Sequence, residues 1–297
     1  MFMRLHFSNF TFYLLCGLAL LLAACEKEVT LVPNTLETRL VVEGTIENGA
    51  APVVILTRSL AYFNSLQPQD LINAFVLDAR VTVSNGSQTT TLTPVNVTVP
   101  GGQVSFYTTS PTLMQGQFNT TYQLRIEHQG QVYEATTRLG APLRRIDSLW
   151  WAPAPNNPDT NRRVVMSRVT DPPGLGNYIR YFTRVNDSAF VPGLNSVFDD
   201  QFVDGTTYDI QIFKGQSRNV PFNQDEFGYF RRGDTVSVKL SNIDKATFDF
   251  WRTWEQNQAN LGNPFGVPVK VLGNISNGAL GYFGGYASQV SRIIIPN

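Results

Sequence analysis

The sequence predicts a mainly β protein with two antiparallel β-sandwich (immunoglobulin-like) domains and one helix in the C-terminal domain. Most hydrophobic segments repeat with a period of about two rather than 3.6, which is typical of strands with one buried face. Clusters of Gly, Pro and Asn separate these segments at short intervals, and no strand–helix–strand rhythm is visible. The chain has 297 residues, which is long enough for two domains with their own cores.

Residues 1–24 are predicted to be a signal peptide. Arg4 precedes an apolar run over residues 10–24, which is too short to span a membrane. The run ends with Leu22, Ala23 and Ala24 directly before Cys25, and this arrangement resembles the bacterial lipobox. Cys25 is therefore the predicted lipidation site and mature N-terminus, and several acyl chains there would hold the protein on a membrane. An ordinary secretory peptide followed by a chance cysteine is the alternative.

Residues 25–38 are expected to form the lipidated cysteine and an extended tether. Glu26, Lys27 and Glu28 follow the cysteine directly. Acidic residues at this place resemble the surface-export signal of Bacteroidetes-type lipoproteins, which predicts a protein that faces the cell exterior. A generic solvated tether is the alternative.

Residues 39–141 are predicted to form the N-terminal sandwich. Tyr122, Leu124 and Ile126 alternate with polar neighbours, as expected for a strand with one wet face. Turn signals such as Asn85-Gly86 separate the strands, and a short helical piece is expected at residues 70–78. The predicted strands are residues 39–47, 52–57, 79–84, 89–92, 104–108, 121–127 and 132–138.

Residues 145–297 are predicted to form the C-terminal sandwich, which begins after Gly140, Ala141 and Pro142. A helix is expected over residues 243–259, because apolar residues recur there every three or four positions. Ser241 is its expected N-cap, with Asp244 as a capping-box partner. The predicted strands are residues 145–151, 164–170, 178–185, 207–213, 235–240 and 291–295.

Charge and composition exclude several classes of function. The 23 basic and 23 acidic residues leave no basic excess for binding nucleic acid. Once the signal peptide is removed, His128 and Cys25 are the only histidine and cysteine. The mature chain therefore has no internal disulfide, Cys/His zinc cluster or Cys–His dyad. We expect no catalytic residues, no cofactor and no metal, and we predict that the protein is not an enzyme.

Two long segments and one glycine-rich run supply candidate partner-facing aromatics. The segments at residues 60–77 and 186–205 look like insertions between strands, and they either recognise a partner or cover the ends of the sandwiches. The run at residues 278–285 is expected to be a tight, packed loop, whose aromatics face a partner or pack in the core. The candidates are Tyr62, Phe63, Phe198, Phe202, Tyr282, Phe283 and Tyr286.

Four acidic residues cluster at positions 199–209. Calcium prefers several carboxylate ligands, but the spacing here is not that of a known calcium loop. A calcium ion and solvated loop charges therefore both remain open. The residues are Asp199, Asp200, Asp204 and Asp209.

The run Asn274-Ile-Ser-Asn-Gly-Ala-Leu-Gly-Tyr-Phe-Gly-Gly-Tyr286, taken with Leu40-Val-Val-Glu-Gly44, resembles a known family. Further matching pieces are Leu56–Ser59, Ala79–Val83, Ile146–Ser148, Asp171–Gly174 and Gly233–Val236. The chain is similar to domain of unknown function 4249, a family of outer-membrane lipoproteins from Bacteroidetes-type bacteria that are often encoded beside TonB-dependent receptors. The resemblance implies such a receptor as partner and attaches no catalytic motif.

The leading expectation is an outer-membrane lipoprotein that acts as a non-catalytic accessory to a TonB-dependent receptor in nutrient uptake. The rival is a structural or adhesive surface lipoprotein. A third possibility is a carbohydrate-binding module that uses the aromatic faces of Trp150, Trp151, Trp251 or Trp254.

Overall fold

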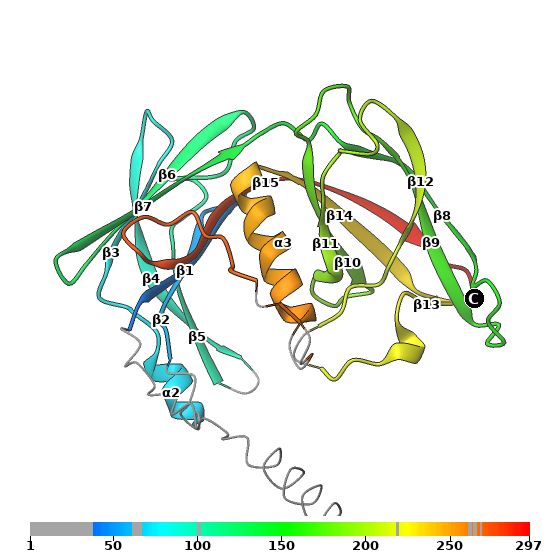
Figure 1. Ribbon diagram of the computed structural model, residues 1–297, viewed down its shortest axis with the longest axis horizontal. Coiled ribbons are helices and arrows are strands. Elements are labelled where there is room, and N and C mark those ends of the chain that lie inside the picture. The colour runs from blue at the N-terminus through cyan, green and yellow to red at the C-terminus, as the bar shows by residue number, and fades with distance from the viewer. Residues whose placement is uncertain are drawn as a thin grey trace, which may run out of the picture. The chain divides into compact units, whose positions relative to one another are not determined.

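A computed structural model describes residues 38–297, apart from residues 61–66, 100–101, 218–219, 261–262, 264–265 and 268 (Figure 1). The predicted signal peptide, Cys25, the charged residues Glu26, Lys27 and Glu28, and the aromatic pair Tyr62 and Phe63 lie outside the described residues. Within the described part of the chain, no helix has the length and apolar character needed to cross a membrane.

The mainly β class is confirmed, and most strands lie where the period-two patterns predict them. The strands are β1 (Leu40–Glu47), β2 (Val53–Arg58), β3 (Arg80–Ser84), β4 (Thr89–Val99), β5 (Gly102–Thr108), β6 (Thr120–His128), β7 (Gln131–Leu139), β8 (Arg145–Pro153), β9 (Arg162–Thr170), β10 (Tyr178–Val185), β11 (Val191–Phe198), β12 (Thr207–Ile212), β13 (Phe230–Arg231), β14 (Thr235–Ile243) and β15 (Leu280–Ile294). The helices are α2 (Pro68–Asn73), the 3₁₀ turn η1 (Gln224–Glu226) and α3 (Lys245–Ala259).

The N-terminal strands enclose one apolar core. Their hydrogen-bonded order is β15-β1-β2-β5-β4-β3-β6-β7, in which β4 pairs with β3 through its first residues and with β5 through the rest. Buried side chains from all of these strands meet in a single cluster. The phenol of Tyr122 donates to the carbonyl of Gln115 and accepts from the N–H of Gln117, so its polar end is satisfied although its ring is fully buried.

The C-terminal strands form two layers with a second core between them. One layer has the order β11-β10-β14-β15, and the other contains β12, β9, β13 and β8. Their facing side chains include Val165, Tyr181, Phe230 and Val238. Helix α3 contributes to a third cluster with β11, β14 and β15 that includes Trp251. In Figure 1 its upper end crosses β15, and β11 runs beside it.

Strand β15 belongs to both cores. Its first residues pair in parallel with β1, with Val42 opposite Gly281, and its later residues pair antiparallel with β14. One continuous eleven-stranded sheet therefore runs through the molecule, and β15 extends from the side of β1 to the side of β14 in Figure 1. The division into domains at residues 141–145 stays a prediction.

The expectation of a loop at residues 278–285 is wrong for most of that run, because β15 begins at Leu280. Its glycines are needed where other backbones come close. Gly281 has φ +99°, and a Cβ there would collide with the carbonyl oxygen of Val42. A Cβ at Gly285 would lie 3.0 Å from the backbone nitrogen of Leu139. Close approach of neighbouring backbones accounts for these glycines, as does the positive φ of Gly281.

Three local predictions also need correction. Strand β14 continues through Ser241 to Ile243, so the N-cap of α3 is Asp244, whose side chain accepts from the N–H of Thr247. The hydroxyl of Ser241 instead lies 2.8 Å from that of Ser288 on β15. The predicted insertion at residues 186–205 contains strand β11, and the short helix expected at 70–78 is α2, which ends at Asn73.

Candidate functional site

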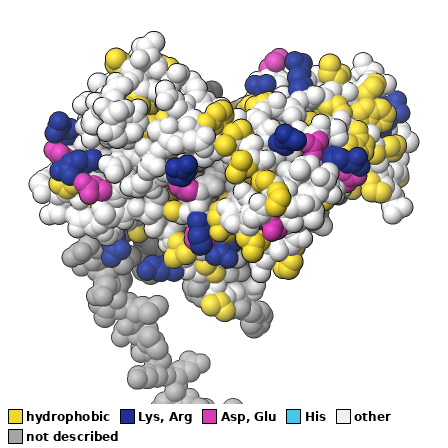
Figure 2. Space-filling view, turned by 90° about the horizontal axis from the view of Figure 1, so that it is seen from above, with side chains coloured by type: hydrophobic (Ala, Val, Ile, Leu, Met, Phe, Trp, Pro, Cys, Tyr) yellow, Lys and Arg dark blue, Asp and Glu magenta, His cyan; other side chains and the backbone are white. Residues whose placement is uncertain are grey.

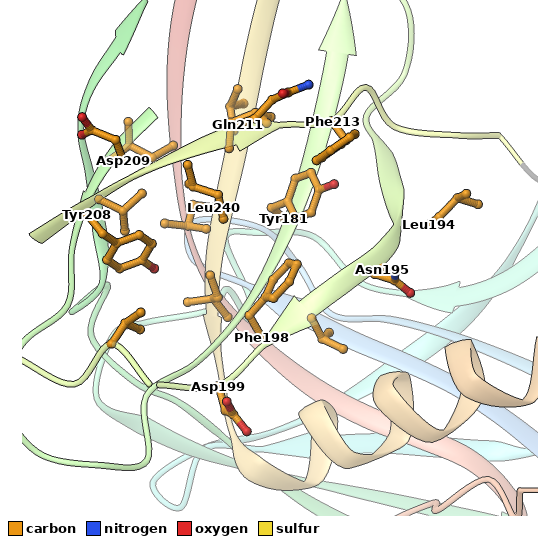
Figure 3. Close-up of a pocket in the computed structure, with 18 of the residues that line it drawn as sticks. Tyr181, Leu194, Asn195, Phe198, Asp199, Tyr208, Asp209, Gln211, Phe213 and Leu240 are labelled. Carbon is orange, nitrogen blue, oxygen red and sulfur yellow. The ribbon is translucent and has the colours of Figure 1, made fainter. Parts of the chain in front are cut away.

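A cavity of about 1120 Å³ lies between the two layers of the C-terminal half (Figure 3). Strands β10, β11 and β14 form one wall, and β12 forms most of the other. Its inner surface is mainly aliphatic and aromatic, with Ile179, Leu240 and Ile212 among the lining residues. A largely apolar cavity with a few polar groups is the usual form of a small-molecule site.

The cavity opens because the two layers are not joined at this side. Strand β11 is the last strand of the eleven-stranded sheet, and β12 is the last strand of the smaller one. The chain passes from β11 to β12 through residues 199–206, and this segment contributes Asp199, Phe202 and Val203 to the lining.

Asp200 fixes this connecting segment in place. Its carboxylate accepts hydrogen bonds from the N–H groups of Gly176 and Asn177, at 3.1 and 2.8 Å. Burial alone would raise the pKa of Asp200, but these hydrogen bonds outweigh it and leave the pKa below its ordinary value of 3.8. Asp204 holds the same loop by accepting from the N–H of Gly174 at 2.6 Å.

Two tyrosines, Tyr181 and Tyr208, belong to the cavity lining. Tyr181 comes from β10, and its ring is stacked on Phe198 at a centroid distance of 6.1 Å. Burial, and secondarily the charge of Glu255, raises the pKa of Tyr181 to about 12. Burial also raises the pKa of Tyr208 on β12, and the charge of Asp171 acts in the same direction. Both phenols are therefore neutral at physiological pH, and each can donate and accept a hydrogen bond.

The charged residues of the cavity lining interact with other protein groups. Asp209 accepts two hydrogen bonds from Arg168, at 2.7 and 2.9 Å. Arg252 of α3 donates to Asp249 at 3.4 Å. Figure 3 places Asp199 at the end of β11 nearest α3, while Tyr181 and Phe198 lie in the middle of the site. The lining thus offers apolar contacts, two neutral tyrosines and the amides Asn195 and Gln211, and its charged residues also reach the surface.

The structure separates the candidate aromatics into two groups. Phe198 and Phe202 line the cavity, and their exposed fractions are 40% and 91%. Tyr282, Phe283 and Tyr286 are buried, so of the two alternatives they pack in the core and do not face a partner. They lie on β15, where Phe283 enters the N-terminal core and the two tyrosines pack against α3. Since glycines flank them, the neighbouring backbones approach closely and enclose the rings.

A buried polar network lies beside these tyrosines. Arg180 donates to the hydroxyls of Ser196 and Tyr286, at 3.0 and 3.3 Å, and its guanidinium lies 3.4 Å from the ring centroid of Trp251. Glu255 accepts from the N–H of Ser196 at 3.0 Å. These contacts join β10, β11, β15 and α3, so the network has a structural role. Trp251 is enclosed within it and cannot offer its face to a sugar.

The acidic residues predicted at 199–209 do not form one site. Asp209 is paired with Arg168, and Asp199 lies at the cavity. Among the described residues, the group with metal-ligand spacing is instead Asp171, Asp200 and Asp204, whose ligand oxygens lie within 4.8 Å of one another. Asp171 forms an ion pair with the buried Arg144, whose positive charge disfavours a cation there. These three residues instead hold in place the loops at the edge of the cavity.

Sequence reasoning missed the cavity and its tyrosines. Tyr181 and Tyr208 occupy ordinary strand positions, and no spacing in the sequence distinguishes them as site residues. The space between two layers depends on how far apart they pack, which a one-dimensional pattern does not record. The only available signal was the apolar content of residues 186–205, which includes Leu194, Phe198 and Phe202.

A family model described as a domain of unknown function (DUF4249) matches residues 26–292, which span nearly the whole chain. A search of curated proteins finds no match to the chain. The match begins directly after Cys25 and includes strands β1 to β14 and most of β15.

Proposed function

The chain belongs to the DUF4249 family, and we propose on that premise that it is a non-catalytic binding protein held on the outer membrane by lipid on Cys25. It faces the cell exterior and acts as an accessory to a TonB-dependent receptor. Its task is to capture a nutrient and present it for uptake.

The observation that carries this proposal is the open cavity between β11 and β12. Its volume of about 1120 Å³ lies slightly above the range of about 300–1,000 Å³ that is usual for small-molecule sites. Its polar residues are Tyr181 and Tyr208, the amides Asn195 and Gln211, the ion-paired Asp209 and Arg252, and Asp199. This set suits binding better than proton transfer or nucleophilic attack. A binding role therefore follows more directly from this lining than a hydrolytic one.

A second feature supports contact with a membrane partner. Figure 2 shows hydrophobic side chains gathered on the face seen from above, over the side where β8, β9 and β12 lie in Figure 1. Apolar surface of this kind often marks an interaction site. The predicted lipid at Cys25 would keep such a surface close to receptors in the same membrane.

The first experiment is to purify the tagged full-length protein in mild detergent from the outer membrane of the bacterium that makes it. We expect a TonB-dependent receptor to co-purify in stoichiometric amount, as identified by mass spectrometry. We also expect a deletion strain to grow poorly on at least one source in a panel of single nutrients. A solitary protein together with normal growth on every source would refute the proposal. Loss of surface attachment in that strain, with normal growth, would favour the adhesive rival.

The anchor is tested with the variant Cys25→Ser, with Cys16→Ser as the matched control. We expect Cys25→Ser to move from the detergent phase to the aqueous phase in detergent partitioning, while Cys16→Ser stays with the detergent. Equal partitioning of the two variants would exclude lipid attachment at Cys25.

Surface exposure is tested by replacing Glu26 and Glu28 with glutamine. We expect external protease to digest the wild-type protein on intact cells and to spare the variant. If digestion is unchanged, the acidic residues belong only to a tether.

A further inference from the structure

We propose that the cavity between β11 and β12 binds an uncharged, lipophilic small molecule. This inference rests on the proposed binding function and adds the chemical class of the ligand. It is tested on the purified protein, so its failure is distinguishable from the absence of a receptor partner.

The shape and lining of the cavity favour an apolar ligand. Both walls present aliphatic side chains, with Ile179 and Leu240 facing Ile212 across the space. A sugar would need a dense set of hydrogen bonds to replace its hydration. The polar lining is sparse. It consists of Tyr181 and Tyr208 with the partly or fully exposed Asn195, Gln211 and Asp199, apart from the ion-paired residues, and it suits a carbonyl, ether or hydroxyl oxygen on an otherwise apolar molecule.

The electrostatics of the cavity favour an uncharged ligand. Both tyrosines remain protonated, because burial raises their pKa values. Asp209 is neutralised by Arg168, Arg252 pairs with Asp249, and the partly exposed Asp199 accepts from the N–H of Gln201 at 3.4 Å. A buried negative charge on the ligand would lose its hydration without gaining a free counter-ion from these groups.

The side chains at the entrance of the cavity give a further reason to expect a bound ligand. Phe202 lies at the cavity with 91% of its surface exposed, and Leu194, Phe198, Ile210 and Phe213 are also exposed there to more than a third. Large apolar side chains gathered at a pocket in this way mark an interaction site. A lipophilic molecule seated between β11 and β12 would cover them.

The experiment compares two dyes that differ by one charge. N-phenyl-1-naphthylamine is uncharged, and 8-anilinonaphthalene-1-sulfonate carries the same aromatic frame with a sulfonate. Both are titrated into the folded chain that follows Cys25, with dye fluorescence as the readout. We expect saturable one-to-one binding of the uncharged dye and at least tenfold weaker binding of the sulfonate.

The variant Phe202→Ser locates the binding site, with Phe118→Ser as the matched control. Phe118 is an exposed phenylalanine in the N-terminal half and does not line the cavity. Phe202 makes little contact with the rest of the protein, so its removal leaves the fold intact, and equal melting temperatures of both variants check this. We expect Phe202→Ser to weaken binding of the uncharged dye about tenfold, since one phenyl ring loses its contact with the dye.

Three outcomes would overturn the inference. The first is no saturable binding of the uncharged dye, and the second is equal affinity for both dyes. The third is equal weakening by Phe202→Ser and Phe118→Ser, which would place the dye elsewhere. Binding of the uncharged dye alone, weakened only by Phe202→Ser, supports the inference whether or not a receptor co-purifies.

Discussion

Arg144 shows how a single side chain can join two parts of this fold. It lies in the segment between β7 and β8, is fully buried and forms an ion pair with Asp171. Its backbone exchanges two hydrogen bonds with the side chain of Asn242 on β14, at 3.0 and 2.9 Å. A buried charge is tolerated only with a partner. The segment between β7 and β8 is therefore held at the one position on the sheet where Arg144 meets Asp171.

Replacing Arg144 with methionine should lower the free energy of unfolding by about 3–5 kcal/mol, because Asp171 is left buried and unpaired. The matched control is Arg145→Met. Arg145 is mostly exposed and pairs with Asp147 at the surface, so its loss should leave stability almost unchanged. Urea unfolding of the two variants measures the difference, and equal effects would contradict this account.

Asp200 predicts a pH dependence of stability. Its pKa in the folded state lies below its ordinary value, because the N–H donors of Asn177 and Gly176 outweigh burial. Its contribution is therefore complete above the unfolded pKa and is lost as the pH falls through the folded pKa. We expect Asp200→Asn to be less stable at pH 7 and to lose less stability than the wild type between pH 5 and pH 3. Unfolding free energies across that range measure this, and parallel curves would contradict it.

At the scale of elements, helix α3 is tied to the N-terminal strands through its cap. Asp244 accepts from the N–H of Thr247 at 2.9 Å, and also from the hydroxyl of Thr137 and the N–H of Arg138 on β7. Asp244→Ala removes three acceptor contacts and should cost about 3 kcal/mol. Asp244→Asn keeps a good cap residue and should cost less. Thermal unfolding compares them, and equal losses would show that the links to β7 contribute little.

The pairing of β1 with β15 depends on a glycine that no other residue can replace. Gly281→Ala would place a methyl group against the carbonyl oxygen of Val42 at a φ of +99°. We expect loss of soluble, folded protein. Gly278→Ala is the control, since it also has a positive φ, of +73°, but nothing within 4 Å, and it should cost only about 1 kcal/mol. Similar yields of folded protein from both variants would contradict the prediction.

The sequence predicted those elements whose side chains alternate clearly. Strand β6 is an example, because Tyr122, Leu124 and Ile126 all point into the core. Strand β11 was missed, because Pro192, Gly193 and Asn195 are poor strand formers and its place is set by pairing with β10. The cavity was missed as a site, because it is a property of the distance between layers.

At the scale of the whole molecule, the N-terminal half should not fold without β15. A fragment of residues 38–143 lacks Phe283 and Ala287 of its core and the hydrogen-bonding partner of β1. We expect the fragment alone to show unfolded circular dichroism, and a peptide of residues 273–297 added in excess to restore strand signal. A peptide of the same composition in scrambled order is the control. A folded fragment without the peptide would contradict the prediction and favour independent domains.

The parallel pairing of β1 with β15 also bears on the biogenesis of the protein. Val42 and Gly281 are neighbours in the sheet, yet about 240 residues separate them along the chain, a high contact order that slows folding. Strand β1 cannot pair with β15 until nearly the whole polypeptide has been synthesised and is free to collapse. The chain is therefore expected to fold only after its synthesis is nearly complete, and until then its unpaired strands are prone to aggregate.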